Sequence, residues 1–405
     1  MRRVMLSGRS CDQVAPLDSK TLARCIRIRR CDPCPASDPR GLHLLAIDMT
    51  VNHWDSTAGD GRRWLIYALG GGMGHLTRAV ALARASAAHS DDSSPPRVCL
   101  LTNSPFADRL PLESQLGAGQ CVVRIDPQLG RLQTARRVAE VFQQTPPEVL
   151  IVDTFPRGLG GELAEVLPTL GCHKVLVHRD LNPRYVAHAR LETSVAQFDR
   201  LLVPGEPAVF ENQPHAVRTA PWLIRDADAL LPVAAARRML EVASNTLPVV
   251  AVIGCGKREE VEQMRSVAQR LAGDCAETAA VRFVTPLSSG NIRSDDPAPA
   301  GPVTVNVWPF LDVIRGVSLI VGSGGYNTVH EARVTGTRLI GWPRRRLYDR
   351  QHRRLREDER SQDVSQIARR VVAALGDLRT SAAVAAPGYQ NGTAAAVAAI
   401  ESLYR

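Results

Sequence analysis

The segment from Val321 to Gly336, with the sequence VGSGGYNTVHEARVTG, constrains the fold of this chain more than any other. A short apolar run, Ser318–Val321, is typical of a buried strand and ends in a group of glycines. A helical pattern follows from about Tyr326 to Thr335, and Gly336 suits the position that closes a helix. A strand, a glycine turn and a helix in this order direct free backbone N–H groups and a positive dipole end at an anion.

This turn lacks the residues of two common phosphate-binding motifs. No Gly-Lys-Ser/Thr follows it, which excludes the Walker pattern, and its spacing differs from the G-x-G-x-x-G of dinucleotide-binding folds. Glu331 lies within reach of a group bound at the start of the helix. A phosphate at the turn with a ribose beside Glu331 is the simplest ligand that fits, and a tight turn without a ligand is the alternative.

Composition favours a globular protein and leaves several partners open. The length of 405 residues predicts two domains, each with its own core. Nine cysteines without a disulfide framework indicate a reducing compartment, so we expect a cytoplasmic protein. The net charge of +9 suits an anionic small molecule, an acidic membrane surface or nucleic acid. No apolar run approaches the roughly 20 residues of a membrane-spanning helix.

The arginine-rich run Arg344–Arg356 bears on the choice among these partners. It lacks the interleaved aromatic residues and the known modules of nucleic-acid binding, so we expect no nucleic-acid partner. We expect a solvated face here. Contact with a phosphate, or with lipid headgroups at the inner membrane face, is the alternative.

Residues 1–61 differ from the rest of the chain, because Arg, Asp, Pro and Cys dominate and periodicity is weak. This composition predicts a disordered extension. Cys31 and Cys34 form one Cys-x-x-Cys pair, whereas a structural zinc site usually has two such pairs. We therefore expect no metal site in this segment.

Apolar runs begin to alternate with helical patterns near Arg62. This alternation predicts α/β domains with parallel, doubly wound sheets, in which ligands bind at the carboxyl ends of the strands. The predicted strands are Trp64–Leu69, Arg97–Thr102, Cys121–Ile125, Val149–Asp153, Lys174–His178, Arg200–Pro204, Leu247–Ile253, Val281–Thr285, Val303–Val307, Ser318–Val321 and Arg338–Gly341. The predicted helices include Leu76–Ala88, Leu132–Phe142, Gly161–Leu170, Glu259–Leu271, Tyr326–Thr335 and Thr393–Leu403.

Glycine-rich turns follow a strand in both halves of the chain, which predicts two similar domains rather than one large sheet. We place these domains at residues 62–225 and 226–405, with a linker near Pro221–Pro232. The last helix is able to pack back on the first domain.

Polar residues in the first half follow predicted strands. His75 lies at the start of a helix, whose dipole disfavours the imidazolium and keeps the ring available as a base; a capping or packing role is the alternative. Asp153 ends the run VLIVD and is a candidate second base or acceptor-binding group, or a turn cap. Arg78 either steadies an anionic group or is a surface charge. A polar cluster lies at the end of the run KVLVH and directly after it, and its members are His178, Arg179, Asp180 and Asn182.

The second half offers groups for a diphosphate and a sugar. Either the backbone N–H groups of the turn at Gly254, Gly256 and Lys257, or the side chains of Lys257 and Arg258, are suited to the same diphosphate. Asp349 and Gln351 follow a strand and a loop, and their side chains are suited to sugar hydroxyls.

Two segments resemble a known family. The sequence ALGGGMGHLTRAVALA is similar to the N-terminal glycine loop of MurG-like GT-B glycosyltransferases, which carry a glycosyltransferase family 28 type C-terminal domain. The sequence VGSGGYNTVHEARVTGTRLIGWP with the later DRQ resembles their donor-binding signature, and WPFLDV and VHRDLNP resemble two flanking segments. The resemblance implies the GT-B fold, in which two Rossmann-like domains face a deep cleft.

The resemblance also implies a function. The C-terminal domain would bind a nucleoside-diphosphate sugar, most simply UDP-linked, and the N-terminal domain would bind a small-molecule or lipid-linked acceptor. Transfer of a hexose or N-acetylhexosamine would be inverting and independent of metal and cofactor, because a helix N-terminus offsets the charge of the leaving diphosphate.

Site residues follow by the same resemblance. His75 and Asp153 would be catalytic. The acceptor side would include Gly72, Gly74, Arg78, His178, Asp180 and Asn182. The nucleotide sugar would contact Gly254, Gly256, Lys257, Phe310, Leu311, Ser323, Gly324, Gly325, Asn327, Thr328, Glu331, Asp349 and Gln351.

The sequence departs from the peptidoglycan enzyme of this family at two places. Its Gly-x-Gly-His-x-x-Arg loop is closer to a predicted glycosyltransferase group and to a hydrolase that releases UDP from a diacetamido-sugar nucleotide. Arg350 stands before Gln351 where that enzyme has two glutamines. A nucleotide-sugar hydrolase and a non-catalytic nucleotide-sugar binding protein therefore remain alternatives, and the sugar and the acceptor stay open.

Overall fold

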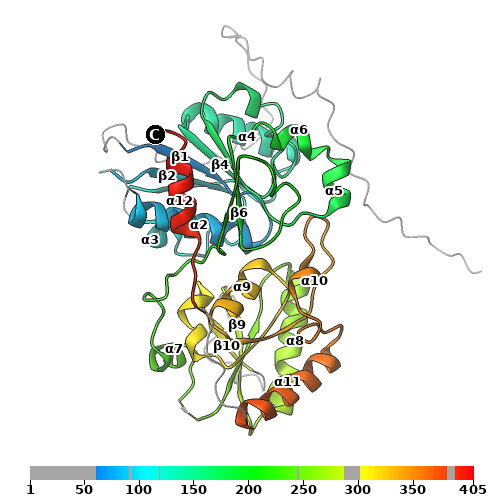
Figure 1. The fold of residues 1–405 in the computed structure, drawn as a ribbon. Coiled ribbons are helices and arrows are strands. Elements are labelled where there is room, and N and C mark those ends of the chain that lie inside the picture. The colour runs from blue at the N-terminus through cyan, green and yellow to red at the C-terminus, as the bar shows by residue number, and fades with distance from the viewer. Residues whose placement is uncertain (1–60, 91–93, 118, 244–245, 287–301, 381–387) are drawn as a thin grey trace, which may run out of the picture.

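The computed structural model describes residues 61–405, apart from 91–93, 118, 244–245, 287–301 and 381–387. The chain forms two α/β domains, one above the other in Figure 1, with the N-terminal domain at the top. The extension expected over residues 1–61, with its Cys31 and Cys34 pair, lies outside the described residues except for Gly61.

Seven parallel strands form the N-terminal sheet, in the order β3-β2-β1-β4-β5-β6-β7. They are β1 (Arg63–Tyr67), β2 (Arg97–Thr102), β3 (Cys121–Arg124), β4 (Val149–Asp153), β5 (His173–Val177), β6 (Arg200–Pro204) and β7 (Ala216–Thr219). The helices of this domain are α2 (Met73–His89), α3 (Leu112–Leu116), α4 (Arg131–Gln144), α5 (Pro183–His188) and α6 (Leu191–Val195). Every strand pair is parallel, as the alternating pattern predicts.

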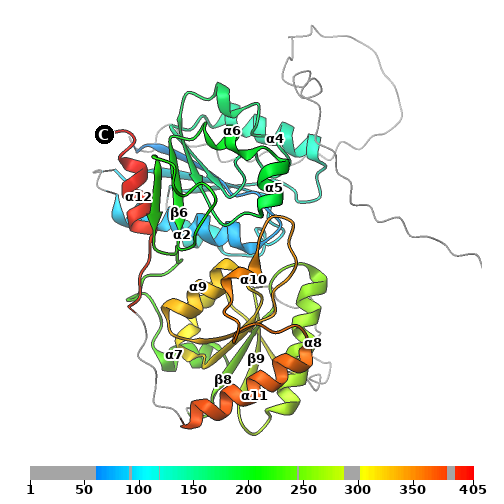
Figure 2. The ribbon, with the colours of Figure 1, turned by 45° about the vertical axis from the view of Figure 1, so that its right-hand side comes forward.

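Five parallel strands form the C-terminal sheet, in the order β10-β9-β8-β11-β12. They are β8 (Val249–Ile253), β9 (Ala280–Thr285), β10 (Val303–Asn306), β11 (Leu319–Gly322) and β12 (Arg338–Gly341). The helices are α7 (Val233–Met239), α8 (Arg258–Asp274), α9 (Tyr326–Val334), α10 (Gln351–Arg354) and α11 (Val364–Thr380). Figure 2 shows α8 and α11 on one side of this sheet, with α9 and α10 toward the upper domain.

The chain passes between the domains twice, and the two passages lie side by side (Figure 1). The side chain of Asn391 accepts a hydrogen bond from the Leu223 amide at 3.0 Å and donates one to the Leu223 carbonyl at 2.9 Å. Tyr389 donates to the Arg225 carbonyl at 2.7 Å. Helix α12 (Thr393–Glu401) then packs against α2 of the N-terminal domain, where Ser90 donates to Glu401 at 2.6 Å.

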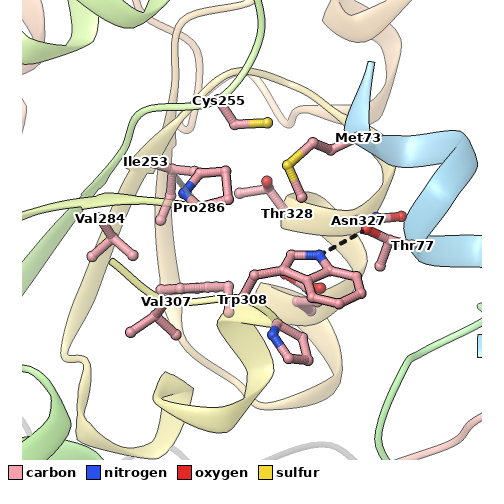
Figure 3. A pocket seen from close by; sticks show the side chains of 13 residues that line it. Met73, Thr77, Ile253, Cys255, Val284, Pro286, Val307, Trp308, Asn327 and Thr328 are labelled. Carbon is pink, nitrogen blue, oxygen red and sulfur yellow. Dashed lines mark hydrogen bonds between the residues drawn. The ribbon is translucent and has the colours of Figure 1, made fainter. Parts of the chain in front are cut away.

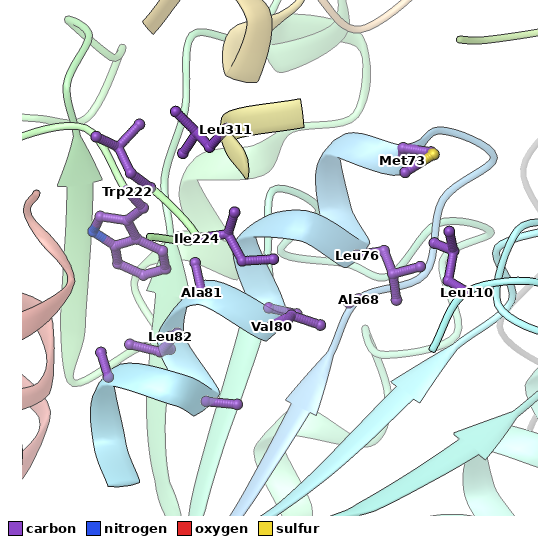
Figure 4. Packing of buried hydrophobic residues seen from close by; sticks show 14 of the residues in the cluster. Ala68, Met73, Leu76, Val80, Ala81, Leu82, Leu110, Trp222, Ile224 and Leu311 are labelled. Atoms are coloured by element: carbon purple, nitrogen blue, oxygen red, sulfur yellow. The ribbon is translucent and has the colours of Figure 1, made fainter. Parts of the chain in front are cut away.

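One apolar cluster runs through the N-terminal core, the interdomain segment and the upper part of the C-terminal domain. Figure 4 shows Trp222 and Ile224 of the linker beside Val80 and Ala81 of α2, with Leu311 of the C-terminal domain close by. All five side chains are buried. The domains therefore share packed apolar surface, and water is excluded from the middle of their junction.

One predicted element is wrong. Residues 161–170, which we expected to be a helix, form turns and a short 3₁₀ segment at Leu167–Thr169. Gly158 and Gly161 have φ angles of 80° and 96°, which a right-handed helix does not contain. Glu162 accepts hydrogen bonds from Tyr67 and from the Gly160 amide, so its carboxylate fixes the turn.

Gly254, directly after β8, has no room for a side chain because the ring of Phe283 covers it. We expect Gly254→Ala to lower the free energy of unfolding by about 1–3 kcal/mol, since the extra methyl group must displace the ring. Gly273 in α8 is the matched control: a methyl group there meets open space, so Gly273→Ala should raise stability by about 0.5–1 kcal/mol. Urea denaturation measures both, and equal stability of the two variants would contradict this packing.

Candidate active site between the domains

The switch points of the two sheets face each other across the domain junction. In the N-terminal sheet, β1 and β4 are neighbours whose connections run in opposite directions, and β8 and β11 have this relation in the C-terminal sheet. Ligands of doubly wound sheets bind in the crevice at such points. The glycine turn after β1, Asp153 at the end of β4 and the turns after β8 and β11 all lie there.

His75, Asp153 and Arg78 form one hydrogen-bonded group. His75 Nδ1 lies 2.6 Å from Asp153 Oδ2. Arg78 donates from Nε to Asp153 Oδ1 at 3.1 Å and from Nη2 to Oδ2 at 2.7 Å. The Asp153 side chain is 2% exposed and that of Arg78 is 1% exposed, whereas His75 keeps 14% exposure. Arg78 is therefore no surface charge, and the imidazole is the solvent-facing member.

The electrostatics of this group leave His75 neutral at physiological pH. Burial lowers the pKa of His75 below its usual value and outweighs the opposing effect of Asp153. Burial also works to raise the pKa of Asp153, but Arg78 and His75 prevail and hold that pKa far below its usual range. The ionised carboxylate accepts the proton on Nδ1, which leaves the lone pair on Nε2 free to accept a proton.

The backbone around this group is tightly constrained. Thr154, next to Asp153, has a φ of 72°, a conformation that costs a β-branched residue roughly 1–3 kcal/mol and is typical of functional sites. The His75 ring lies against Gly70, where an added Cβ would be 2.6 Å from Nε2. A residue with a side chain at position 70 would displace the imidazole, so the glycine turn allows the ring to take this position.

Aromatic rings lead from His75 toward the second domain. The imidazole stacks on Phe155 with ring centres 5.4 Å apart. Tyr348, from the loop after β12, meets Phe155 edge-on at 5.1 Å and Tyr185 at 4.6 Å. Sequence reasoning missed Phe155, Tyr185 and Tyr348, although Phe155 stands two residues after Asp153. The rings supply an apolar wall beside the imidazole.

A mostly apolar pocket of about 80 Å³ lies between α2 and the ends of β8, β9 and β10 (Figure 3). Met73 and Thr77 of the N-terminal domain face Trp308 of the C-terminal domain across it. Trp308 donates a long hydrogen bond of 3.4 Å to Thr77. Phe310, which we expected to contact the nucleotide, lines the pocket, and its role stays a prediction. Trp308 of the WPFLDV segment also lines the pocket, and sequence reasoning missed it.

Two polar groups of α9 stand in the wall of this pocket without a protein partner in the described part of the chain. Oδ1 of Asn327 is buried and accepts no hydrogen bond there. The Glu331 side chain is buried and forms no ion pair with any described cation, and burial raises its pKa to about 7. Thr328 lines the same wall. These groups are suited to bind hydroxyl groups of a ligand.

The turn before α9 presents the start of that helix. Gly325 is its N-cap and provides no side-chain cap, so the first amides of α9 have no partner within the helix. Gly324 is covered by Gln351, whose carbonyl oxygen would lie 2.6 Å from an added Cβ. Ser323 and Gly325 remain partly exposed. The Arg344 amide donates a hydrogen bond to Gln351 Oε1 at 2.8 Å.

The turn before α8 is built differently. Glu260 accepts a hydrogen bond from the Lys257 amide at 3.0 Å and pairs with Arg346 at 2.6 Å. A carboxylate therefore already occupies part of this turn. Gly254 is covered by Phe283, Gly256 is the left-handed residue of the turn, and the Lys257 side chain is exposed at its outer end.

The loop 342–350, which we name the strap, runs from β12 to α10 and binds the N-terminal domain. The Asn182 amide donates to the Tyr348 carbonyl at 2.9 Å, and its side chain donates to the Leu347 carbonyl at 3.2 Å. Asp180 forms an ion pair with Arg350. The polar groups of Asp180 and Asn182 therefore hold the strap in this structure, where we expected them to face an acceptor.

Ion pairs between the domains continue beyond the strap. Arg354 of α10 pairs with Glu206, which follows β6, and with Asp349 at 2.6 Å. Asp349, expected at the donor sugar, is thereby engaged by an arginine. The expectation of a solvated face over Arg344–Arg356 is wrong for Arg346, Arg350 and Arg354, because each side chain pairs with a carboxylate.

Two other expected site residues lie inside the protein. His178 is fully buried; its Nε2 accepts a hydrogen bond from the Phe210 amide at 3.0 Å, and burial lowers its pKa to about 4. Leu311 is fully buried in the cluster of Figure 4, so its side chain belongs to the core and not to the pocket. Gly72 and Gly74 flank Met73 at the start of α2, beside the pocket. The roles assigned to these residues stay predictions.

No group of three His, Cys, Asp or Glu residues in the described ranges could hold a metal ion. No helix in this part of the chain has the length and apolar character needed to cross a bilayer.

Known structures share this architecture. No protein-family model matches the chain, and no curated protein matches it. The glycosyltransferase of kitacinnamycin is 16% identical with a TM-score of 0.55, over 86% of this chain and all of its own. The spinosyn rhamnosyltransferase SpnG complexed with thymidine diphosphate is 17% identical with a TM-score of 0.52, over 84% of this chain and all of its own.

The chain has the GT-B fold. The expected fold is thus confirmed. A UDP-GlcNAc 2-epimerase from Neisseria meningitidis bound to UDP-GlcNAc has it too, at 12% identity and a TM-score of 0.53, over 85% of this chain and all of its own. Because the GT-B fold serves more than one reaction, function must be argued from the site.

Removing Asp153 should destabilise the protein strongly. Asp153→Ala leaves the Arg78 charge buried without its partner, so we expect the free energy of unfolding to fall by about 3–5 kcal/mol at neutral pH. The depressed pKa of Asp153 means that this stabilisation is full above the unfolded pKa of about 4 and is lost at lower pH.

Glu148→Ala, which removes an exposed pair with Arg62 and Arg63, is the control and should cost less than about 1 kcal/mol. Chemical denaturation at several pH values measures both variants. A loss in Asp153→Ala no larger than in the control would contradict the buried pair.

Proposed function

We propose that this protein transfers a sugar from a nucleoside-diphosphate sugar to an acceptor hydroxyl, with inversion and without a metal. The hydrogen bond between His75 Nδ1 and Asp153 carries the proposal, because it fixes the proton on Nδ1 and leaves Nε2 to accept a proton, while burial keeps the ring neutral. This imidazole belongs to the domain opposite α9, whose first amides and positive dipole end suit a diphosphate.

The donor would lie along the face of the C-terminal domain. Trp308 and Phe310 provide aromatic surface for the base, Glu331 provides a carboxylate for the ribose hydroxyls, and Ser323 to Gly325 lead the diphosphate to the start of α9. Neighbours of the same fold have thymidine diphosphate or UDP-GlcNAc bound. We infer a pyrimidine nucleoside diphosphate as the carrier, with UDP as the first choice.

The acceptor would approach from the N-terminal side. Phe155, Tyr185 and Tyr348 form an apolar wall that continues from the imidazole. Such rings favour an acceptor with a flat or apolar body and a free hydroxyl group. We therefore propose a small hydroxylated molecule as acceptor.

The reaction follows from these positions. His75 Nε2 takes the proton of the acceptor hydroxyl while its oxygen forms a bond to the anomeric carbon of the sugar. The bond from that carbon to the diphosphate oxygen breaks on the opposite face, and the diphosphate leaves against the amides of α9. Asp153 keeps Nδ1 protonated and stabilises the imidazolium that forms, and Arg78 fixes Asp153.

Donor binding on this plan requires the domains to separate. The pocket at Trp308 holds about 80 Å³, whereas ordinary ligand pockets measure roughly 300–1,000 Å³. Met73 and Thr77 of the N-terminal domain close one side of it. The base would enter after the contact between Thr77 and Trp308 opens, and closure would then bring His75 toward the sugar.

Assays with UDP-sugars test the reaction. With a donor alone we expect slow UDP release, and with a panel of small hydroxylated aromatic acceptors we expect faster release and a glycosylated product in mass spectrometry. Rapid release that no acceptor accelerates would indicate the hydrolase instead, with water in place of the hydroxyl group.

In the same assays His75→Ala should lower the rate by about 10²–10⁴-fold while UDP binding survives, since the variant loses only its base. His188→Ala, which removes an exposed histidine of α5, is the control and should retain the wild-type rate. Equal rates for wild type and His75→Ala would refute the catalytic role. UDP-sugar binding with no turnover in wild type would favour a non-catalytic binding protein.

Glu331→Gln tests the donor-binding role. The amide keeps the shape but not the charge, so UDP should bind roughly tenfold more weakly at pH 8. Because the pKa of Glu331 is about 7, the wild-type carboxylate becomes protonated as the pH falls from about 8 to 6, and its advantage over the variant should vanish. Calorimetric titration with UDP at both pH values measures this. If the ratio of the wild-type to the Glu331→Gln affinity for UDP were the same at both pH values, the assignment would be contradicted. Protonation of UDP itself affects both proteins equally and cancels in this ratio.

A further inference from the structure

A second cavity, of about 370 Å³, lies between the domains apart from the pocket at Trp308. The N-terminal domain contributes the segment from Gly205 to Val209 after β6. The C-terminal domain contributes His330 and Arg333 of α9 and Arg353 and Arg354 of α10. Asp180, which we expected on the acceptor side, and Arg350 also line the cavity; no other lining residue belongs to the donor or acceptor positions described above.

Helix α9 separates the two cavities. Successive helical residues are rotated by about 100°, so Tyr326, His330 and Arg333 share one face. Asn327, Thr328 and Glu331, which line the pocket at Trp308, share the opposite face. The second cavity is therefore a separate site behind the helix and not an extension of the donor pocket.

The charges around the second cavity leave a positive excess. Of its lining arginines, Arg350 is neutralised by Asp180 and Arg354 by Glu206. Arg333 shares Glu359 with Arg356, and its Nε is buried without a partner in the described residues. Arg353 is an exposed residue and pairs with no carboxylate of the described chain. The Arg353 guanidinium thus remains available to an anion, whereas that of Arg333 has part of its donors engaged, because its Nη2 donates to the Arg354 carbonyl and to Glu359.

His330 supplies an independent sign of a ligand. Its side chain is 6% exposed, lines the cavity, and has a buried Nε2 without a hydrogen-bond partner in the described part of the chain. A buried polar atom left without a partner costs free energy, roughly 1–3 kcal/mol. Its ring packs against Tyr326 at a centroid distance of 4.3 Å, so the imidazole is held in place.

We propose that this cavity binds a compact oxyanion, either a phosphate ester or a small polycarboxylate. Arg333 and Arg353 would each donate to its oxygens, and His330 Nε2 would donate as a neutral group. Guanidinium groups bind such oxygens in pairs of hydrogen bonds, which favours phosphate and carboxylate over larger, softer anions. Since both domains line the cavity, the bound anion would also hold them in the arrangement seen here.

The test is calorimetric titration of the full chain with inorganic phosphate, pyrophosphate and citrate, each without UDP and with UDP in excess. We expect one saturable site for at least one of these anions, and the anion that binds identifies the phosphate or the carboxylate class. Arg353→Glu and His330→Phe should each weaken it by about tenfold or more. Arg369→Glu, an equal charge change at an exposed residue of α11, should bind as wild type does.

Other outcomes would overturn the proposal. Equal loss in Arg353→Glu and Arg369→Glu would mean an adventitious ion only, attracted by net charge. Binding that excess UDP abolishes would place the anion at the donor pocket. Absence of saturable binding for all three anions would exclude the site. Because Arg353 is exposed, its variant should fold normally, and thermal unfolding checks this. Each titration can be read whether or not sugar transfer is detected.

Discussion

The buried ion pair between Asp153 and Arg78 determines how the rest of the site is arranged. Its carboxylate orients His75 on one side, and its guanidinium lies over the ring of Tyr326 at 5.3 Å on the other. Arg179 lies near the same ring at 4.6 Å. Tyr326 in turn donates to the Pro204 carbonyl and accepts from the Trp222 amide. One pair of charges thus connects a strand end, a helix start and the second domain.

Much of the fold could be predicted because local patterns decide it. Apolar runs that end in glycine or Asp gave the strand ends, and parallel sheets bring such ends to one edge. This is why His75, Asp153 and the turn before α9 were found as candidates. The turn at Gly158 to Glu162 was missed because a side-chain contact to Tyr67, 95 residues away, overrides the local helical pattern.

The contacts between the domains could not be predicted in this way. Asp180 and Arg350 are 170 residues apart, so no local sequence pattern indicates that they pair. A run of arginines in a sequence is typical of a solvated face, because the sequence does not show which carboxylates of the other domain lie opposite it. The burial of Arg78 could not be predicted either. Its position on α2 is compatible with an exposed side chain, and it is buried because the end of β4 and the start of α9 enclose it. Ligand pockets formed by two domains depend on such pairings.

The two side-by-side passages between the domains also restrict how the protein can move. A single flexible connection would let the domains twist and slide. The two hydrogen bonds between Asn391 and Leu223, which we name the clasp, instead join the two interdomain segments to each other along one line. Rotation about that line is the motion that leaves the clasp intact. The strap and its partners Asp180 and Asn182 lie on the side of the junction opposite the two passages (Figure 1), so such a rotation would separate them furthest.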